Sequence, residues 1–336
     1  MHGKVSHGNH GKHGKISYGP NRNIMQHFRT EVTVTPTPIV DHITKIVTAG
    51  SCFADNIGQM LSENKFITSV NPLGVCYNPI SIHEGFLIKE ADDTLYVESQ
   101  GTWRHFNFHS KFSDPEKSKL SGNLSTQLNA VRSFNADVII LTYGTAWVYR
   151  YQNKIVANCH KRPSSEFEKV LLTPEEIVQS FEVFRKTFKK KIILTLSPVR
   201  HIKDTLELNQ VSKSVVRLAI HEILKKFPEV EYFPAYEIMM DDLRDYRFYE
   251  TDMIHPSVVA VDYIWNKFGE RYFTTPAIEL MNRWQKLRTS LNHRAFHPEL
   301  KQHTGFLQQL LSDLKELNTR LDVSKEITEI ERRLND

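Results

Sequence analysis

Two runs near the middle of the chain are almost entirely apolar, and they constrain the fold more than any other feature. Residues 137–143 read DVIILTY and residues 191–197 read KIILTLS. Runs of this length that are rich in isoleucine and leucine are typical of strands buried on both faces of a parallel sheet. Weaker strand patterns and helical patterns alternate along the rest of the chain: strands at residues 45–48, 66–70 and 231–234, and helices at residues 53–64, 174–190 and 207–227. The alternation predicts an α/β fold with a mainly parallel sheet covered by helices on both faces.

Two interruptions of this alternation predict small β-insertions. Residues 96–112 alternate like a strand pair around Gln100-Gly101. Residues 149–159 resemble a hairpin that turns at residues 152–154. Insertions of this kind commonly shape a substrate cleft.

The pattern becomes helical after Phe273 and predicts a C-terminal extension. We expect a last helix over residues 304–335, with one apolar stripe that consists of six leucines: Leu307, Leu310, Leu311, Leu314, Leu317 and Leu321. Such a stripe packs either on the body of the protein or on a second subunit, so a homodimer through these helices is one prediction. The chain then divides into a tail at residues 1–24, a main domain at residues 25–275 and a helical extension at residues 276–336.

The first 24 residues contain no acidic residue and little hydrophobic periodicity. They carry four histidines among glycine and lysine: His2, His7, His10 and His13. Clustered histidines can chelate a metal, but flexible tracts of this composition are more often a cloning leader or an overlong start, with Met25 as the native start. We therefore predict a disordered tail.

The composition is that of an ordinary globular protein. Of 336 residues, 40% are hydrophobic and 24% are charged, which is enough for a sizeable core. The formal charge of +4 comes wholly from Lys4, Lys12, Lys15 and Arg22; without them, the 43 basic residues become 39, equal to the 39 acidic residues. The body is neutral and has no basic surplus to attract nucleic acid or an anionic membrane, so neither is expected as a partner.

The three cysteines, Cys52, Cys76 and Cys159, lack the spacing of a zinc site or of a disulfide framework. So few cysteines in a long chain indicate reduced thiols. The chain also lacks an apolar run long enough to span a membrane and the apolar segment of a signal peptide. These features predict a cytoplasmic protein that needs no metal and no cofactor.

The segment Thr48-Ala-Gly-Ser-Cys-Phe-Ala-Asp55 is the strongest local signal for chemistry. A predicted strand runs through Gly50 and Ser51 directly into a predicted helix, which places Ser51 at the carboxyl edge of the sheet. The N–H groups and the positive dipole end of that helix would stabilise a serine alkoxide and the oxyanion formed by its attack. Taken alone, Ser51 is equally well explained as a helix N-cap.

A second signal is Glu250-Thr-Asp-Met-Ile-His-Pro-Ser257, at the start of a helix predicted over residues 256–265. Proline suits a first helical position, so Pro256 would hold His255 in the turn before the helix. Asp252 then folds back to one imidazole nitrogen and leaves the other free to accept a proton from serine, as in a Ser-His-Asp triad. The alternative is that the two residues are only a capping pair.

The residues of these segments resemble those of a known family. Gly50-Ser-Cys-Phe-Ala54 spells the name of the GSCFA family, and four more blocks look like its other motifs: Asn71-Pro-Leu-Gly-Val-Cys-Tyr-Asn-Pro79, Tyr143-Gly-Thr-Ala-Trp147, Ser197-Pro-Val-Arg-His201 and the Asp252/His255 pair. The resemblance runs from about Phe28 to Phe273. The family is similar to SGNH/GDSL-type hydrolases, which implies a flavodoxin-like three-layer α/β/α sandwich. It also implies that Ser51 is the nucleophile, His255 the general base and Asp252 its orienting carboxylate.

The resemblance further implies an oxyanion hole, of which one part is missing. The donors in such enzymes are the serine N–H, a glycine N–H from the second block, which Gly74 matches, and the asparagine of a Gly-x-Asn block. Here Gly144-Thr-Ala146 has alanine at the asparagine position. Loss of one donor typically lowers the rate about a hundredfold, so an active enzyme needs a replacement. The candidates are the Thr145 hydroxyl, Asn158, His160 and His201.

Each candidate has an ordinary structural alternative. His160 and His201, taken singly, are more often histidines of a loop or a cleft wall; together with Asn71 they are the expected substrate contacts. Cys52 is next to the serine, and a helix N-terminus lowers the pKa of a thiol. Its side chain should nevertheless point away from Ser51 and into the helix packing.

Three functions fit these observations, ranked as follows. The first is a serine-dependent ester hydrolase or O-acyltransferase that acts on a small O-acyl ester, such as an acetyl ester, which the resemblance suggests is carbohydrate-linked. The second is a non-catalytic glycan-binding or ester-binding protein on a degenerate hydrolase scaffold, motivated by the missing asparagine. The third is metal-dependent hydrolysis with Asp252, His255, His160 and His201 as ligands.

Overall fold

The structure is a computed structural model that describes residues 30–292 and 301–335. The tail predicted at residues 1–24 lies outside the described residues. The described residues beyond Thr30 belong to one compact unit.

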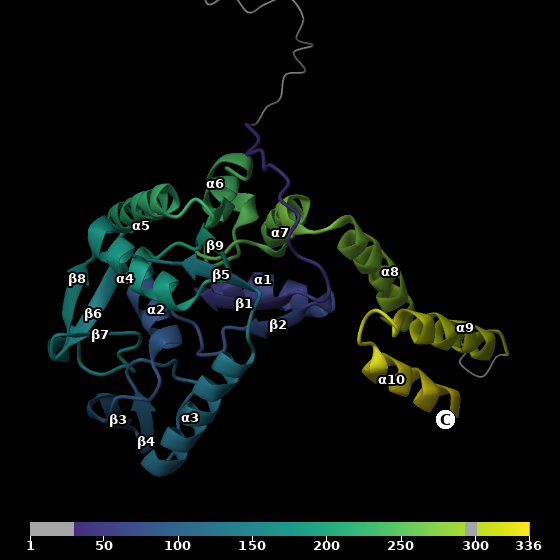
Figure 1. Cartoon of the computed structure of the whole chain (residues 1–336), viewed down its shortest axis with the longest axis horizontal. Helices are drawn as coiled ribbons and strands as arrows, with labels where there is room; N and C mark the ends of the chain where they lie inside the picture. The colour runs from purple at the N-terminus through teal and green to yellow at the C-terminus, as the bar shows by residue number, and fades with distance from the viewer. Residues whose placement is uncertain (1–29, 293–300, 336) are drawn as a thin grey trace, which may run out of the picture. The chain divides into compact units, whose positions relative to one another are not determined.

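The central sheet has five strands, and every neighbouring pair is parallel. The strands are β1 (Lys45–Gly50), β2 (Ile67–Val70), β5 (Val138–Tyr143), β9 (Lys191–Leu196) and β10 (Glu231–Phe233). Their spatial order is β2-β1-β5-β9-β10, the flavodoxin-like order of a doubly wound sheet (Figure 1). The predicted α/β fold is therefore confirmed.

Helices cover both faces of this sheet and form a three-layer sandwich. On one face, α1 (Cys52–Glu63) and α7 (Val258–Tyr272) pack on Ile46, Ile140 and Ile193. On the other face lie α2 (Pro79–Leu87), α4 (Pro174–Thr187) and α5 (Leu206–Lys226). These helices pack on the next residue of each strand, among them Val47, Leu141 and Leu194. Both side-chain faces of the strands are thus buried, which is why their sequences are continuously apolar.

Two β-insertions interrupt the sheet, as predicted. The first is the antiparallel pair β3 (Tyr96–Ser99) and β4 (Thr102–His105), which is followed by α3 (Lys117–Ser133). The second contains β6 (Trp147–Tyr151), β7 (Lys154–Val156) and β8 (Glu168–Leu171). Neither β8 nor the helices α2 and α3 are predicted from the sequence. In α3 only Leu120, Leu124 and Leu128 are buried, so its apolar signal is weak.

Short helical turns connect the larger elements. They are Asp93–Leu95, Ser164–Glu166, Ile202–Asp204, Ala235–Glu237, Ile238–Asp242 and Tyr246–Phe248.

The C-terminal extension consists of α8 (Thr275–Asn292), α9 (Lys301–Leu317) and α10 (Ser324–Asn335). The single helix predicted over residues 304–335 is wrong. Asn318 and Asp322 accept hydrogen bonds from the N–H groups of Val323 and Ser324, and these local turns end one helix and start the next.

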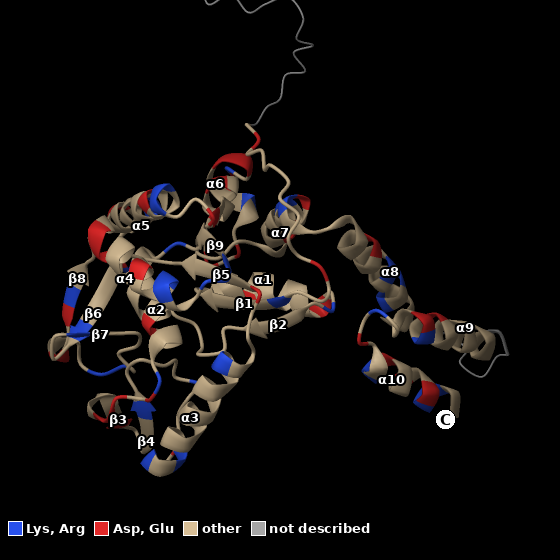
Figure 2. Cartoon of the chain, in the orientation of Figure 1, with Lys and Arg blue, Asp and Glu red and all other residues tan. Residues whose placement is uncertain are grey.

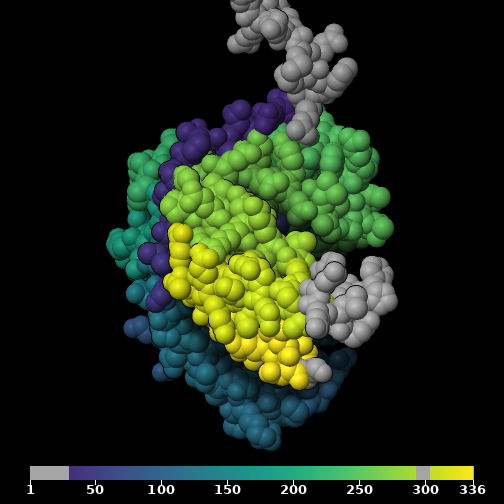
Figure 3. Space-filling view, turned by 90° about the vertical axis from the view of Figure 1, so that its right-hand side faces the viewer, coloured from purple at the N-terminus to yellow at the C-terminus, as the bar shows by residue number. Residues whose placement is uncertain are grey.

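Five of the six leucines of the predicted stripe are buried inside the chain, and Leu311 is half-buried against them. Leu307, Leu310, Leu314, Leu317 and Leu321 share a hydrophobic cluster with residues of α8 and α10. Figure 3 shows α9 and α10 in yellow beside the yellow-green α8. The extension therefore has a small core of its own.

Basic and acidic residues are interleaved along the described elements rather than separated by sign (Figure 2). None of the described helices has the length and the apolar character required to cross a membrane.

Candidate active site

Ser51 lies at the turn between β1 and α1. Gly50 makes the turn with φ of +140°, and a Cβ at this position would lie 2.1 Å from the carbonyl oxygen of Thr142. The Ser51 side chain caps α1 by accepting a hydrogen bond from the N–H of Phe53 at 3.3 Å. Ser51 is fully buried. Both predicted properties, a position at the carboxyl edge of the sheet and an N-cap, hold at the same residue.

The hydroxyl of Ser51 donates a hydrogen bond to the Oγ atom of Ser197 at 2.9 Å. Ser197 directly follows β9 and also accepts from the N–H of Val199 at 3.3 Å. Sequence reasoning assigned no role to Ser197. The signal was available, because a serine that directly follows a buried parallel strand lies at the same edge as Ser51.

Lys213, on α5, is a second residue that sequence reasoning missed. Its ammonium group is fully buried and donates to the carbonyl oxygens of Gly144 at 2.8 Å and Ser197 at 2.7 Å. Burial lowers the pKa of Lys213 to about 7. Lys213 thus joins the chain segments that follow β5 and β9. Its signal is a lysine at helical spacing from the buried Asn209, Val216 and Ile220.

Asp252 and His255 form a hydrogen-bonded pair, with 2.7 Å between Oδ2 of Asp252 and Nδ1 of His255. Asp252 also accepts from the N–H groups of Ile254 and His255. The hydrogen bond from His255 and these two N–H groups lower the pKa of Asp252 to about 2. Nδ1 is therefore held by a carboxylate that stays ionised at neutral pH.

The predicted helix start at Pro256 is wrong. Helix α7 begins at Val258, and Ser257 is its N-cap, whose side chain accepts from the N–H of Ala260. Pro256 instead pairs with Tyr249 in an isolated antiparallel bridge. His255 is positioned by Asp252 and this bridge, not by a proline in the first helical turn.

The turn that carries His255 lies beside the segment that follows Ser197. The N–H of Arg200 donates to the carbonyl oxygen of Ile254 at 3.1 Å. The charge of His255 is the smallest of the causes that shift the pKa of His201, and it acts to lower it. Ser51 and His255, both among the described residues, share no hydrogen bond. Ser51 is fully buried, whereas the side chain of His255 is 44% exposed.

The predicted backbone donors of the oxyanion hole have partners in the structure. The N–H of Ser51 donates to the carbonyl oxygen of Thr142 at 3.1 Å, and the N–H of Gly74 donates to that of Asn71 at 2.8 Å. Gly74 has φ of +83°, and a Cβ there would lie 2.1 Å from Cβ of His109. Close packing is thus one reason for glycine at this position.

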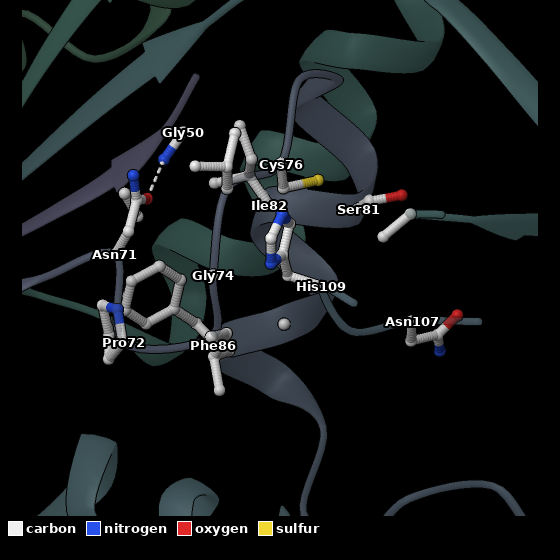
Figure 4. A pocket seen from close by; sticks show the side chains of 15 residues that line it. Gly50, Asn71, Pro72, Gly74, Cys76, Ser81, Ile82, Phe86, Asn107 and His109 are labelled. Carbon is white, nitrogen blue, oxygen red and sulfur yellow. Dashed lines mark hydrogen bonds between the residues drawn. The ribbon is translucent and has the colours of Figure 1, made fainter. Parts of the chain in front are cut away.

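Asn71, a predicted substrate contact, holds the turn next to Ser51. Its side chain accepts from the N–H of Gly50 at 2.8 Å and donates to Asp55 at 2.7 Å. Asn71, Gly50 and Gly74 line a cavity of about 30 Å³, together with Cys76 (Figure 4). Such a cavity is large enough for a water molecule or two, so it is no substrate pocket.

Three other candidate donors are also engaged. The Thr145 hydroxyl lies 2.8 Å from the hydroxyl of Ser212. The side-chain amide of Asn158 contacts Ser110 at 3.4 Å and accepts from the N–H of His160. Both ring nitrogens of His160 have partners, the carbonyl oxygen of His105 at 2.9 Å and the hydroxyl of Ser110 at 3.2 Å. The structure groups Asn158 and His160 with the first β-insertion.

His201 differs from the other candidates, because its buried Nε2 atom has no hydrogen-bond partner among the described residues. Burial lowers the pKa of His201 to about 4. The ring borders a cavity of about 370 Å³ together with Tyr77, Trp147, Arg200 and Ile254. This cavity is large enough for a small ligand. Ile254, which lines it, directly precedes His255 in the chain.

The sequence left open two other chemistries, a Cys52 nucleophile and metal-dependent hydrolysis. The Cys52 thiol packs against the core on the α1 face, and burial raises its pKa, which disfavours the thiolate. Within the described residues, no group of three or more His, Cys, Asp or Glu side chains is arranged to hold a metal ion.

Comparison with known proteins adds a family but no activity. The chain is similar to a solved structure, a family 3 carbohydrate esterase from Clostridium thermocellum, with 12% identity and a TM-score of 0.30 over 71% of this chain and 97% of that one. At these values, the likeness carries no argument about activity. A search of curated proteins found no match.

Two family models match the chain. Residues 284–336 match the C-terminal domain of GSCFA domain proteins. Residues 45–268 match the GSCFA family and include all of the motif blocks noted in the sequence. The chain belongs to the GSCFA family.

Proposed function

We propose that this protein is an SGNH-type serine esterase or O-acyltransferase, with Ser51 as nucleophile, His255 as general base and Asp252 as the residue that orients it. The Asp252–His255 pair carries the proposal. Its 2.7 Å hydrogen bond uses Nδ1 and leaves Nε2 without a partner among the described residues. The turn that carries this base is bonded through Ile254 to the segment after β9, and the same segment holds Ser197, the partner of Ser51. A base oriented in this way and a serine at a helix N-terminus are the parts of a nucleophilic acyl-transfer site.

The proposed reaction begins when the Ser51 hydroxyl turns from Ser197 towards His255. The Oγ atom forms a bond to the acyl carbon, and Nε2 of His255 accepts the hydroxyl proton. The bond between the acyl carbon and the alcohol oxygen then breaks, and the alcohol leaves with the proton from His255. Water or a second hydroxyl attacks the acyl-enzyme, gives its proton to His255 and releases Ser51, which takes that proton back.

The larger cavity supports a substrate with a sugar. Its wall combines the aromatic rings of Tyr77, Trp147 and Tyr149 with the charged side chains of Arg200 and Lys203. Aromatic faces beside hydrogen-bonding groups suit a sugar ring, which has apolar C–H faces and a polar rim. We propose an acetyl group on a carbohydrate as the ester.

Covalent labelling tests the proposal. A fluorophosphonate should add one phosphonyl group to the protein, and peptide mapping should find it on Ser51. Ser51→Ala should show no mass change and no turnover of p-nitrophenyl acetate, because the proposed reaction forms its acyl bond to the Ser51 hydroxyl. The matched control is Ser118→Ala, an exposed serine on α3, which should be labelled like the wild type. Unlabelled wild-type protein would contradict the proposal.

One observation favours a second candidate function, a glycan-binding or ester-binding protein without turnover. Ser51 is fully buried, and its hydroxyl is bonded to Ser197 rather than to His255. If this arrangement persists with ligand bound, the serine cannot attack. Calorimetry that shows saturable binding of an acetylated sugar, with no acetate released, would support this function; acetate release that depends on Ser51 would exclude it.

A further inference from the structure

The proposed reaction creates a negative charge that the structure must accommodate. When Ser51 attacks, the carbonyl oxygen of the ester becomes an oxyanion, and hydrogen-bond donors aimed at it supply much of the rate. The two backbone donors expected at this edge, the N–H groups of Ser51 and Gly74, are bonded to Thr142 and Asn71. A donor without a partner is therefore the group to look for.

His201 has such a donor position. Its Nε2 atom is buried and has no hydrogen-bond partner among the described residues. A buried polar atom without a partner is unfavourable, and a ligand that bonds to it would remove this cost. By contrast, Thr145, Asn158 and His160 use their polar atoms within the protein.

The position of Nε2 is at the edge of the sheet that carries Ser51. It lies 3.1 Å from the point where a Cβ of Gly144 would be, so glycine at this position leaves room for the imidazole. Gly144 follows β5, the strand whose Thr142 accepts the N–H of Ser51. Lys213 binds both Gly144 and Ser197, the hydroxyl partner of Ser51.

The ring is held in place by its surroundings. The N–H of His201 donates to the side chain of Asn209 at 2.9 Å, which anchors the backbone. The imidazole meets the ring of Tyr77 edge to face, with 5.3 Å between the centroids. A donor fixed before the reaction does not have to be reorganised during it.

The buried imidazole of His201 is neutral at neutral pH. Burial, followed by the charge of Lys213, lowers the pKa of His201 to about 4. A neutral imidazole carries one ring proton, and with that proton on Nε2 it donates a hydrogen bond without acting as an acid.

We infer that His201 is the oxyanion donor of this site, with its Nε2–H directed at the ester carbonyl oxygen. The inference rests on the proposed function. It also explains how the site can work with alanine at residue 146. His201 would donate the hydrogen bond that an asparagine side chain at this position would otherwise donate to the oxyanion.

Substitution of His201 tests the inference. His201→Ala should lower kcat on p-nitrophenyl acetate by about a hundredfold while KM changes little, because the lost hydrogen bond forms in the transition state. His201→Gln should recover at least tenfold of that loss, since the glutamine amide can place an N–H near the position of Nε2. The exposed His221→Ala is the matched control and should retain wild-type rates.

The tautomer gives a second readout that does not depend on activity. In protein labelled with ¹⁵N-histidine, the ring shifts of His201, assigned by comparison with His201→Gln, should report a proton on Nε2 at pH 7. A proton on Nδ1 would overturn the inference. So would a folded His201→Ala protein within twofold of the wild type, or a His201→Gln protein no better than His201→Ala.

The outcomes separate this inference from the proposed function. If wild-type protein is not labelled, or if Ser51→Ala retains turnover, the proposed function fails. If turnover depends on Ser51 but not on His201, only the assignment of His201 fails.

Discussion

A buried, hydrogen-bonded polar group lies at the carboxyl edge of the sheet and consists of Ser51, Ser197 and Lys213. The Ser51 hydroxyl is bonded to Ser197, whose carbonyl oxygen is bonded to the buried Lys213 ammonium. Each of these groups would destabilise the fold if it were buried alone, because a polar group without a partner loses its hydration. Their mutual hydrogen bonds offset this loss and hold the nucleophile in its resting position.

A buried histidine on α2 makes stability depend on pH. His83 is fully buried and lies 2.6 Å from the hydroxyl of Tyr143 and 2.8 Å from that of Ser180. Burial lowers the pKa of His83 to about 3. The unfolded chain binds a proton below pH 6.5, whereas the folded protein does not until about pH 3. The contribution of the neutral His83 to stability is therefore fully present above pH 6.5 and is lost as the pH falls towards 3.

We expect the free energy of unfolding to decrease by up to about 1.4 kcal/mol per pH unit from this group between pH 6 and pH 4. Urea unfolding at several pH values measures the slope. His83→Gln should give a shallower slope, whereas the exposed His221→Gln should leave it unchanged. An unchanged slope in folded His83→Gln would contradict the assignment.

At the scale of an element, the β1–α1 turn depends on one residue without a side chain. Gly50 brings β1 so close to Thr142 of β5 that no Cβ fits, and its φ of +140° is unfavourable for any other residue. The same turn aims Ser51 at the edge of the sheet. Its geometry is therefore a requirement of both the fold and the site.

Gly50→Ala should lower the free energy of unfolding by at least about 2 kcal/mol, because a backbone strain and a clash act together. Gly101→Ala is a matched control: Gly101 also has a positive φ, of +73°, but nothing lies within 4 Å of the added Cβ. The free energy of unfolding of Gly101→Ala should decrease by only about 1 kcal/mol, the approximate value of the backbone strain alone. Equal losses in the two variants, measured by urea unfolding, would argue against the clash.

At the scale of the whole molecule, the C-terminal extension is joined to the sandwich by polar contacts near the end of α1. The indole N–H of Trp284 donates to the carbonyl oxygen of Glu63 at 2.7 Å. Lys65 forms an ion pair with Glu326 at 2.7 Å and lies over the Trp284 ring. Leucines of the stripe pack within the extension, and a homodimer through the outer surfaces of these helices stays a prediction.

Trp284→Ala should expose the extension to local unfolding. The change removes a buried aromatic ring from the small core of α8, α9 and α10, which typically lowers stability by about 3–5 kcal/mol. Hydrogen exchange should become faster in α9 and α10 and stay unchanged in β5 and β9. Glu326→Gln removes only the ion pair with Lys65 and should change exchange little. Faster exchange throughout the sheet would show that the two parts unfold together.

The sequence by itself determined the five strands of the central sheet and their alternation with helices, because strands buried on both faces must be apolar throughout. It also placed Ser51 at a strand end and Asp252 beside His255, since these depend on neighbours along the chain. It missed α3, whose apolar side is three leucines, and merged α9 with α10, because turns such as those of Asn318 and Asp322 carry little signal.

Only the tertiary structure decided which polar groups meet. The partner of Ser51 is Ser197, 146 residues away, and Lys213 reaches Gly144 across 69 residues. No local pattern records such pairings, because hydrogen bonds between strand ends depend on the order of the strands in the sheet. For the same reason, the sequence could name Thr145, Asn158, His160 and His201 as candidate donors, whereas packing decided that His201 alone among them keeps a buried ring nitrogen without a partner.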